Sequence, residues 1–396
     1  MASLVDDCVA PSVDVTLARC LSQLSGVFAG AGGIWPPYTW LVATPAAKVR
    51  SRERVGQVCA AGDEPLTLRL RLIDELRRVV GFDWYAFVLT DPQTMVGCAP
   101  LADVPAALLA QLPRLIRLKY LTPLNRWTTI GPRGVALLRR ASGDDPSRSL
   151  VWSQLLAAHG VGDVASLVLR DRFGCWGFLD LWRCGTAARL SADEEDFLAD
   201  IAEPVTAALR RSQASTFHAH SPRPPRPGPV VLLLTRDLDV LAQTPPTQAL
   251  LRVLIPPGHD PTPIPAGAYN VAAQLLAADA GVDTSPAWAR VHVAEGLWLT
   301  LRAAPIGDAE TGVGSGIAVS IEESSPAERV DLFARCFALT TRERELLGHL
   351  VKGNDTKQIA RAMFLSEHTV QDHLKSIFAK TSTHTRKTLL SRVLGM

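Results

Sequence analysis

The chain closes with Leu339-Thr-Thr-Arg-Glu-Arg-Glu-Leu-Leu347, Asp355-Thr-Lys-Gln-Ile-Ala360 and Leu365-Ser-Glu-His-Thr-Val-Gln-Asp-His-Leu-Lys375, the segments that decide its fold. Apolar residues recur here every three or four positions, so four segments are each expected to form a helix with one apolar face. Four such faces can close around a small shared core. The apolar positions are Leu347, Leu350 and Val351; Ile359, Met363 and Phe364; Val370, Leu374, Ile377 and Phe378; and Leu389, Leu390 and Val393.

Helix start and stop signals agree with this division. A Ser, Thr or Asp before a helix can cap its first N–H groups, and a Glu or Gln three residues later completes a capping box. A glycine after the last turn can take up the left-handed conformation that ends a helix. The start signals are Thr340 with Glu343, Asp355 with Gln358, and Ser366, and the stop signal is Gly353.

The second and third helices are separated by only a few residues, which is typical of a helix-turn-helix whose second member enters the DNA major groove. Turning the apolar face of the third helix inward leaves outside the small, hydrogen-bonding residues that base reading needs. These are His368, Thr369, Gln371, Asp372, Lys375, Ser376 and Ala379. Residues 339–396 hold ten Lys and Arg against five Asp and Glu, a net charge of +5, while the rest of the chain carries −3. This basic segment favours DNA binding.

These residues resemble the LuxR-type helix-turn-helix of bacterial transcription regulators. The resemblance covers 339–396 and lies in Leu-Thr-x-Arg-Glu at 339–343, the run 353–360, Leu-Ser-Glu-x-Thr-Val-x-x-His at 365–373, and Ile377, Lys380 and Arg386. It implies double-stranded DNA as a partner, with Thr369 and Lys380 at phosphates. Gln371 and Lys375 are one turn apart and can reach base edges. The expected DNA-binding residues are Lys357, Thr369, Gln371, Asp372, Lys375, Ser376, Lys380 and Arg386.

Gln371 and Asp372 depart from the family pattern, because many relatives carry Lys and an apolar residue at these positions. The operator sequence therefore cannot be carried over from a relative. The alternative use of these helices is a small bundle for protein contacts.

Composition indicates a globular protein of the cytoplasm. Hydrophobic residues make up 47% of the chain and charged residues 20%, and no apolar run approaches the roughly 20 residues that span a bilayer. The start, Met1-Ala-Ser-Leu-Val-Asp-Asp7, lacks the basic residues of a signal peptide. Seven cysteines without a Cys-x-x-Cys pair indicate reduced thiols, with a redox role for Cys175 or Cys184 as the alternative. We therefore expect a cytoplasmic protein with no membrane contact.

Residues 66–212 show the element order of an α+β domain. A helix is expected over 66–80, strands over 84–90, 164–170 and 175–182, and a closing helix over 192–211 after the capping box of Ser191 with Glu194. This order resembles a GAF domain, which implies a small-ligand site or a dimerising scaffold. Residues 1–65 are predicted to form an N-terminal helical extension without assigned chemistry.

Aromatic side chains gather in the middle of this domain. An apolar pocket with a few polar groups is how small-molecule sites are usually built, and residues 119–127 mix rings with Arg and Asn. The expected ligand-binding residues are Trp84, Tyr120, Arg126, Trp127, Trp152 and Trp176, with Arg126 as the contact for an anionic group. The alternative is an ordinary core, where bulky rings are common.

A proline-rich linker, 213–229, leads to a second α+β domain at 230–325. Strands are expected over 230–234, 240–242, 290–293, 297–303 and 316–321, with a helix over 247–254 and an irregular loop over 256–265. This order resembles a PAS domain. A connecting helix at 326–338 follows. The predicted fold is a multidomain α+β chain, in which GAF-like and PAS-like sensor domains precede a four-helix LuxR-type domain.

Catalytic and metal-ligand motifs are missing from the sequence. There is no phosphate loop, Gly-x-Ser-x-Gly or His-Glu-x-x-His, and the nine histidines lack ligand spacing. We therefore expect no enzyme activity, metal site or cofactor, but a transcription regulator gated by a small ligand in the sensor domains. The alternative is a ligand-independent regulator whose front domains only dimerise or bind a partner protein.

A homodimer is expected, because the helix over 192–211 has a broad apolar stripe. A two-fold dimer also presents two reading helices to half-sites about one helical turn apart. RNA polymerase is a further candidate partner. The stripe consists of Phe197, Leu198, Ile201, Ala202, Val205 and Leu209.

Overall fold

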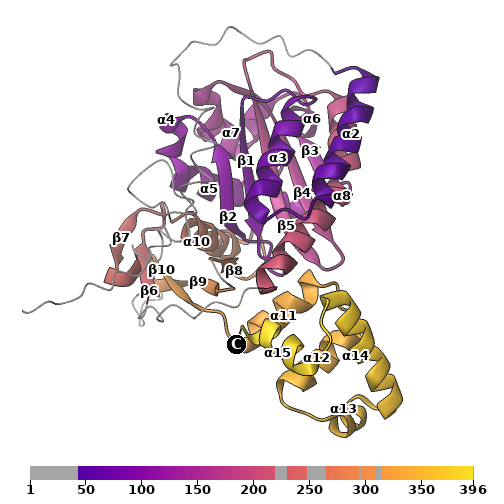
Figure 1. The fold of residues 1–396 in the computed structure, drawn as a ribbon. Coiled ribbons are helices and arrows are strands. Elements are labelled where there is room, and N and C mark those ends of the chain that lie inside the picture. The colour runs from indigo at the N-terminus through magenta and orange to yellow at the C-terminus, as the bar shows by residue number, and fades with distance from the viewer. Residues whose placement is uncertain (1–42, 219–229, 248–264, 294–295, 308–313, 396) are drawn as a thin grey trace, which may run out of the picture. The chain divides into compact units, whose positions relative to one another are not determined.

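The computed structural model describes residues 43–218, 230–247, 265–293, 296–307 and 314–395. Within them, two five-stranded antiparallel sheets precede a group of C-terminal helices (Figure 1). This arrangement confirms the predicted fold class. The predicted extension before residue 43, the linker from residue 219, and most of the helix and loop expected between 247 and 265 lie outside the described residues.

The first sheet has the strand order β2-β1-β5-β4-β3, and every neighbouring pair is antiparallel. Its strands are β1 (Trp84–Thr90), β2 (Gly97–Asp103), β3 (Val135–Leu137), β4 (Val161–Asp171) and β5 (Gly174–Cys184). The three strands predicted in this region are confirmed as β1, β4 and β5. The sequence did not reveal β2, whose proline and alanines are poor strand formers, or β3, which has only 3 residues.

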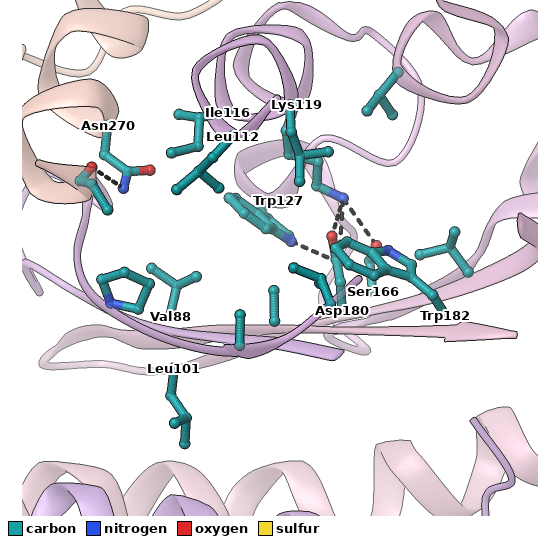
Figure 2. Close-up of a pocket in the computed structure, with 18 of the residues that line it drawn as sticks. Val88, Leu101, Leu112, Ile116, Lys119, Trp127, Ser166, Asp180, Trp182 and Asn270 are labelled. Carbon is teal, nitrogen blue, oxygen red and sulfur yellow. Dashed lines mark hydrogen bonds and ion pairs between the residues drawn. The ribbon is translucent and has the colours of Figure 1, made fainter. Parts of the chain in front are cut away.

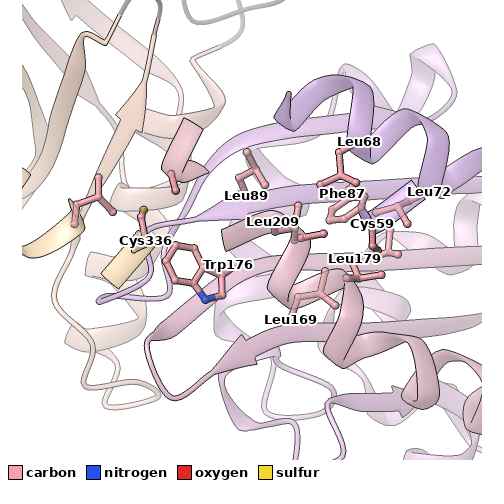
Figure 3. Close-up of a cluster of buried hydrophobic side chains, with 14 of the residues drawn as sticks. Cys59, Leu68, Leu72, Phe87, Leu89, Leu169, Trp176, Leu179, Leu209 and Cys336 are labelled. Carbon is pink, nitrogen blue, oxygen red and sulfur yellow. The ribbon is translucent and has the colours of Figure 1, made fainter. Parts of the chain in front are cut away.

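One face of this sheet is covered by α2 (Pro45–Ala60), α3 (Pro65–Arg77) and α8 (Ala192–Ser215), which runs into η4 (Thr216–His218). Large apolar side chains fill the space between these helices and the sheet (Figure 3). α2 packs beside α3 and α8, where Ser51 Oγ donates to Glu75 at 2.7 Å and Arg52 pairs with Asp200. The predicted extension therefore contributes a helix to the layer that covers the first sheet.

The apolar stripe of α8 is used inside the chain. Phe197 and Leu198 are fully buried, and Val205 and Leu209 are nearly so, because α8 packs on the sheet and on α2. A helix face that is covered within one chain offers no apolar patch to a second copy. The expectation of a dimer through this stripe is therefore corrected, and the homodimer stays a prediction without that support.

Short helices cover the opposite face of the first sheet. They are α4 (Ala106–Leu109), α5 (Leu112–Leu121), α6 (Leu138–Ser142) and α7 (Leu150–Gln154), together with the single-turn helices η1 (Trp127–Thr129), η2 (Pro146–Arg148) and η3 (Leu156–His159). Most of them span too few residues to show a helical period, so the sequence did not predict them.

The second sheet has the strand order β7-β6-β10-β9-β8, which repeats the order of the first sheet when strands are counted along the chain. Its strands are β6 (Val230–Leu234), β7 (Val240–Gln243), β8 (Trp288–His292), β9 (Trp298–Gly307) and β10 (Gly314–Glu323). All five predicted strands of this region are confirmed.

The second region also contains α10 (Ala266–Asp279), which the sequence did not predict. This helix packs against β9 of its own sheet and against α5 and β2 of the first region. A helix buried on nearly all sides has no amphipathic period to detect. The available signals were at its ends, with Pro265 before it and Gly281, at φ +66°, after it.

A buried arginine joins the two sheets to the next helix. Arg290 on β8 is 1% exposed, and its Nε and Nη2 lie 2.6 and 3.0 Å from the two carboxylate oxygens of Asp91, which is 0% exposed. Arg290 Nη1 donates to the Glu328 carbonyl at 2.8 Å and to Asp331 at 3.2 Å. These two residues lie on α11 (Pro326–Cys336), which confirms the predicted connecting helix.

α11 is followed by α12 (Thr341–Val351), α13 (Thr356–Met363), α14 (Glu367–Thr381) and α15 (Arg386–Leu394). Their buried apolar faces meet in one core, as predicted. Phe364, which was expected on the apolar face of the second helix, is instead 94% exposed, because it ends α13 in the left-handed conformation. The predicted caps are confirmed at Thr340 with Glu343, Asp355 with Gln358, Ser366, and Gly353, whose φ is +83°. Within the described part of the chain, no helix has both the length and the apolar character needed to cross a membrane.

Candidate functional sites

The turn between α13 and α14 is short and sets the direction of α14. Phe364 ends α13 in the left-handed conformation, with φ +55°, and Ser366 already caps α14. Val370, Leu374 and Ile377 are buried on the inner face of α14, so its outer face is left to solvent. This is the placement that a DNA-reading helix requires.

The predicted DNA-binding residues fall into two groups by exposure. The side chains that face solvent freely are Lys357, Gln371, Asp372 and Lys375. The partly covered ones are Thr369, Ser376, Lys380 and Arg386.

Hydrogen bonds link several of these side chains across the turn. Gln371 Nε2 and Arg386 Nη2 donate to Thr356 Oγ1, at 3.4 and 2.6 Å, so both side chains lie beside the first turn of α13. On the outer face of α14, Lys375 Nζ donates to Asp372 at 3.2 Å. The structure therefore brings Gln371, Lys375 and Arg386 to one side of the helix-turn-helix.

Two of the predicted DNA contacts, Ser376 and Lys380, bind inside the domain. Both donate to Glu343, Ser376 Oγ at 2.6 Å and Lys380 Nζ at 2.6 and 2.9 Å. Burial of Glu343 by itself would raise its pKa, but hydrogen bonds from Lys380, Ser376 and Thr340 N outweigh it and lower the pKa to about 2. Lys380 thus joins α14 to the start of α12 without any DNA.

This contact predicts a pH dependence for the stability of the C-terminal helices. Because the folded pKa of Glu343 is depressed, its contribution is fully present above the ordinary value of 4.5 and is lost as the pH falls toward about 2. Glu343→Gln is expected to cost roughly 1–3 kcal/mol at neutral pH. Hydrogen exchange of the α14 amides in the full chain measures this loss of stability. The gap in stability between the variant and the native protein should narrow in acid. A gap that widens in acid would contradict the assignment.

A cavity of about 340 Å³ lies between the first sheet, its short helices and α10 (Figure 2). This volume falls within the range of small-molecule pockets, roughly 300–1,000 Å³. Most of its lining is apolar, including Val88 of β1 and Ile116 of α5. The second region supplies Asn270, Val291 and Leu301, so the walls come from both sheets and their helices.

A polar cluster interrupts the apolar lining. Lys119 Nζ of α5 lies 2.9 Å from Asp180 Oδ2 of β5 and donates to Ser166 Oγ of β4 at 3.1 Å. Trp127 Nε1 donates to Asp180 Oδ1 at 2.9 Å, and Figure 2 marks these contacts with dashed lines. All four side chains are buried. The cluster therefore provides a water-shielded site at which a polar group of a small molecule can bind.

The C-terminal helices match a known family. The sequence profile described as "Bacterial regulatory proteins, luxR family" matches residues 338–393. The spore germination protein GerE of Bacillus subtilis is 38% identical over 58 residues, which are 15% of this chain and 78% of that protein. The chain belongs to the LuxR family of bacterial regulatory proteins. The match falls on helices α12 to α15.

Two further relatives match over a short stretch. The monoamine regulon transcriptional regulator of Klebsiella aerogenes is 46% identical over 54 residues, which are 14% of this chain and 24% of that protein. The CsgBAC operon transcriptional regulatory protein of Escherichia coli is 42% identical over 53 residues, which are 13% of this chain and 24% of that protein. The matched part of this chain spans about a quarter of the length of these relatives.

Two solved structures are distant likenesses of this LuxR-family chain. The crystal structure of Escherichia coli SdiA is 12% identical with a TM-score of 0.36, over 88% of this chain and 98% of that chain. The bacteriophytochrome from R. palustris is 13% identical with a TM-score of 0.32, over 80% of this chain and 77% of that chain. At these TM-scores neither likeness bears on the function of the front domains.

Of the six residues predicted to bind a ligand, Trp127 lines the cavity of this LuxR-family protein. Trp84 and Trp152 pack behind its wall, in the apolar cluster around Trp182. Tyr120 is buried nearby, and its hydroxyl oxygen accepts from a backbone N–H of β2 at 3.0 Å. These three rings therefore support the wall of the cavity but are not among the residues that line it.

Arg126 faces the loop after α10. Its Nη1 donates to the Val282 carbonyl, and its Nε lies 3.9 Å from Asp283. The guanidinium that the sequence suggested as an anion contact is thus engaged with the second region and does not line the cavity.

Trp176 lies on the other side of the sheet, in the core that Figure 3 shows. The reason is an irregularity in the pairing of β4 with β5, where Leu169 pairs with Gly177 but Arg170 pairs with Cys175. Trp176 is the extra residue of this bulge, and a bulge re-aims a side chain relative to the alternation of its strand.

Sequence reasoning missed the residues that carry the polarity of the cavity. A signal was present in the predicted strands, because Ser166 and Asp180 are polar residues inside otherwise apolar runs. A buried polar residue in a central strand is more informative than a buried ring. The missed lining residues are Lys119, Ser166, Asp180, Trp182 and Asn270.

Proposed function

We propose that this protein is a transcription regulator whose affinity for DNA is set by a small molecule bound in the cavity. The cavity carries this proposal, because about 340 Å³ of space with one buried polar cluster lies inside the sensor region. Protein interiors are close-packed, and voids larger than a water molecule are few. A cavity of this size favours a ligand site over front domains that only dimerise or bind a partner protein.

We assign α14 to the major groove of DNA. Gln371 and Lys375 are exposed one turn apart on this helix, and their side-chain types pair well with adenine and guanine edges. We assign Lys357, Thr369 and Arg386 to phosphates, because they lie at or beside the first turns of α13 and α14. Free N–H groups at a helix start also favour phosphate oxygens.

The remaining DNA-binding candidates receive different roles. We assign Ser376 and Lys380 to positioning α14, because both are held by Glu343. Asp372 is exposed on the outer face beside Lys375, where its charge disfavours a close phosphate. The RNA polymerase contact and the homodimer stay predictions, the latter because two reading helices can contact two half-sites about one helical turn apart.

The route of control that we propose runs through β8. Val291 of this strand lines the cavity, and its neighbour Arg290 binds both Asp91 and Asp331 of α11. Arg344 of α12 lies 3.4 Å from the same Asp331. A ligand with a higher affinity for one conformation of β8 than for another can thus shift the position of α11 and of the DNA-binding helices.

The test begins with selection of random-sequence duplexes on the full chain, which should converge on one site. N-phenylnaphthylamine, a neutral apolar dye, should bind the free chain and change its affinity for the selected duplex by about tenfold, a typical coupling between two sites. Ile116→Trp should block the dye, because Ile116 lines the cavity. Leu241→Trp, at an exposed residue of β7 outside the lining, is the matched control.

Four outcomes would each contradict a different part of this proposal. Selection without convergence would contradict a sequence-specific regulator. Dye that binds equally to native chain and Ile116→Trp would show that it occupies another place. Dye that fills the cavity with no change in DNA affinity would favour the ligand-independent alternative. Sedimentation that finds one chain per duplex would contradict the homodimer.

A further inference from the structure

One threonine hydroxyl links side chains from three of the C-terminal helices. Thr356 is the first residue of α13, and its Oγ1 accepts hydrogen bonds from Gln371 Nε2 of α14 at 3.4 Å and from Arg386 Nη2 of α15 at 2.6 Å. The two donors are 15 and 30 positions away along the chain. Thr356 is half-buried and Gln371 is exposed. The hydroxyl therefore lies at the surface, between the proposed base contact and a proposed phosphate contact.

The bonding capacity of this hydroxyl is almost used up. A threonine hydroxyl has two acceptor lone pairs and one hydrogen to donate. Gln371 and Arg386 both donate to it, so they occupy the lone pairs, and no residue in the described part of the chain accepts its hydrogen. The bond from Arg386 is the stronger of the two, because its donor is charged and the distance is short. Thr356 can therefore bind a further group only by donating to an acceptor.

Gln371 keeps the groups that it needs to read a base while it contacts Thr356. Its amide has two N–H hydrogens and an acceptor oxygen, and Thr356 uses one of the hydrogens. The second hydrogen and Oε1 are the pair that a glutamine presents to an adenine edge. The 3.4 Å contact is long, so it biases the amide toward the start of α13 without fixing it. The hydroxyl thus limits the orientations of Gln371 before DNA arrives.

Arg386 is held more firmly by the same oxygen. A long side chain that is already ordered loses less freedom when it binds, so its contact contributes more to affinity. In a helix-turn-helix the second helix enters the groove while the first crosses the sugar–phosphate backbone. The start of α13 then lies where a phosphate oxygen can accept the hydrogen of Thr356, with the charge of Arg386 beside it.

We propose that Thr356 is a positioning residue of the DNA interface. Its oxygen orients Arg386 and Gln371, and its hydrogen binds a phosphate oxygen of DNA. The inference rests on the proposed function, because it takes α14 as the helix that reads bases. Thr356 carries no charge of its own, so most of its effect on DNA binding passes through the two side chains that it holds.

Thr356→Val tests the proposal on the full chain, because valine keeps the shape of threonine and removes the hydroxyl. Affinity for the selected duplex should fall about tenfold, the effect of one hydrogen bond. Thr356→Ser keeps the hydroxyl and should bind close to the native value. Thr341→Val is the matched control, since Thr341 is likewise the first residue of its helix, is exposed, and has no hydroxyl partner among the described residues. Its affinity should stay native.

Double substitutions separate positioning from a merely structural role. Residues in one hydrogen-bond network have effects that do not add. In an Arg386→Ala background, the loss caused by Thr356→Val should therefore shrink from about tenfold to about threefold. Thr356→Val should also lower the preference for the selected duplex over random DNA. In a Gln371→Ala background it should lower this preference no further, because the side chain that it orients is gone.

Two results would overturn the positioning role and leave the proposed function intact. One is an equal loss from Thr356→Val in the native and the Arg386→Ala backgrounds. The other is Thr356→Ser binding as weakly as Thr356→Val. If Thr356→Val does not fold, Thr356→Ala also lacks the hydroxyl and takes its place in every comparison. Failure of the native chain to select any duplex would instead overturn the proposed function itself.

Discussion

Asp91→Ala is expected to lower the free energy of unfolding by about 3–5 kcal/mol, because it leaves a buried arginine without its carboxylate. Arg290 and Asp91 are 1% and 0% exposed, so water cannot replace the lost partner. The substitution also removes the acceptor of two N–H groups in the turn after β1, those of Gln93 and Thr94. Both effects act in the same direction. Because Arg290 also binds Asp331, the substitution should also weaken the contact between β8 and α11.

Urea unfolding of the full chain, followed by tryptophan fluorescence, measures this cost. The matched control is Asp279→Ala, which breaks a 3.3 Å pair with Arg236 whose side chains are 38% and 47% exposed. Exposed pairs are worth about 0–1 kcal/mol, so the control should change stability little. Equal effects of the two substitutions would mean that the Arg290 cluster does not join the two sheets as described. Asp91→Asn, which keeps the shape of the side chain, should retain part of the turn but not the charge.

Gln371→Ala is expected to reduce the preference for the selected duplex over random DNA by about 1–3 kcal/mol, the range for a good base contact. Gln371 is exposed on α14, and its contact with Thr356 at 3.4 Å is weak enough to exchange for a base edge. Affinity for random duplex should stay near native, because phosphate contacts supply most non-specific binding. Titration of both duplexes at several salt concentrations measures the sequence preference and the non-specific affinity separately.

Lys357→Ala is the matched control for this experiment. As an exposed cation at the start of α13, Lys357 should contribute to both duplexes alike, and its loss should flatten the salt slope by about one unit. Asp372→Ala removes a negative charge beside Lys375 and should tighten both complexes. If Gln371→Ala weakens both duplexes equally, α14 does not read bases through this residue.

The C-terminal helices could be predicted from the sequence because their signals are local. A cap such as Ser366 and an apolar period such as that of α14 act within one or two turns, so neighbouring residues are sufficient to detect them. The same holds for β1 and β6, whose apolar runs are bounded by turn residues. The proposed DNA-binding surface followed from these elements, since the buried face of α14 determines which residues remain outside.

The candidate ligand site could be predicted only in part. The sequence predicted the correct domain and Trp127, because a local excess of aromatic residues can be recognised without knowledge of the fold. It did not reveal that a bulge places Trp176 on the opposite face, since the bulge depends on how β4 pairs with β5. Nor did it reveal α10, which is buried by contacts on both sides and therefore lacks the polar stripe that marks a surface helix.

Local pattern alone therefore determined the helix-turn-helix, its caps and its exposed face, because each depends on residues a few positions apart. Tertiary structure alone decided the two ion pairs on which the further predictions depend. Lys119 and Asp180 are 61 positions apart, and Asp91 and Arg290 are 199 apart. Each is buried, and a buried charge is tolerated only where the fold brings its partner into contact. No residue spacing in the sequence predicts such a contact, because the contact arises from the pairing of strands and the packing of helices that lie far apart along the chain.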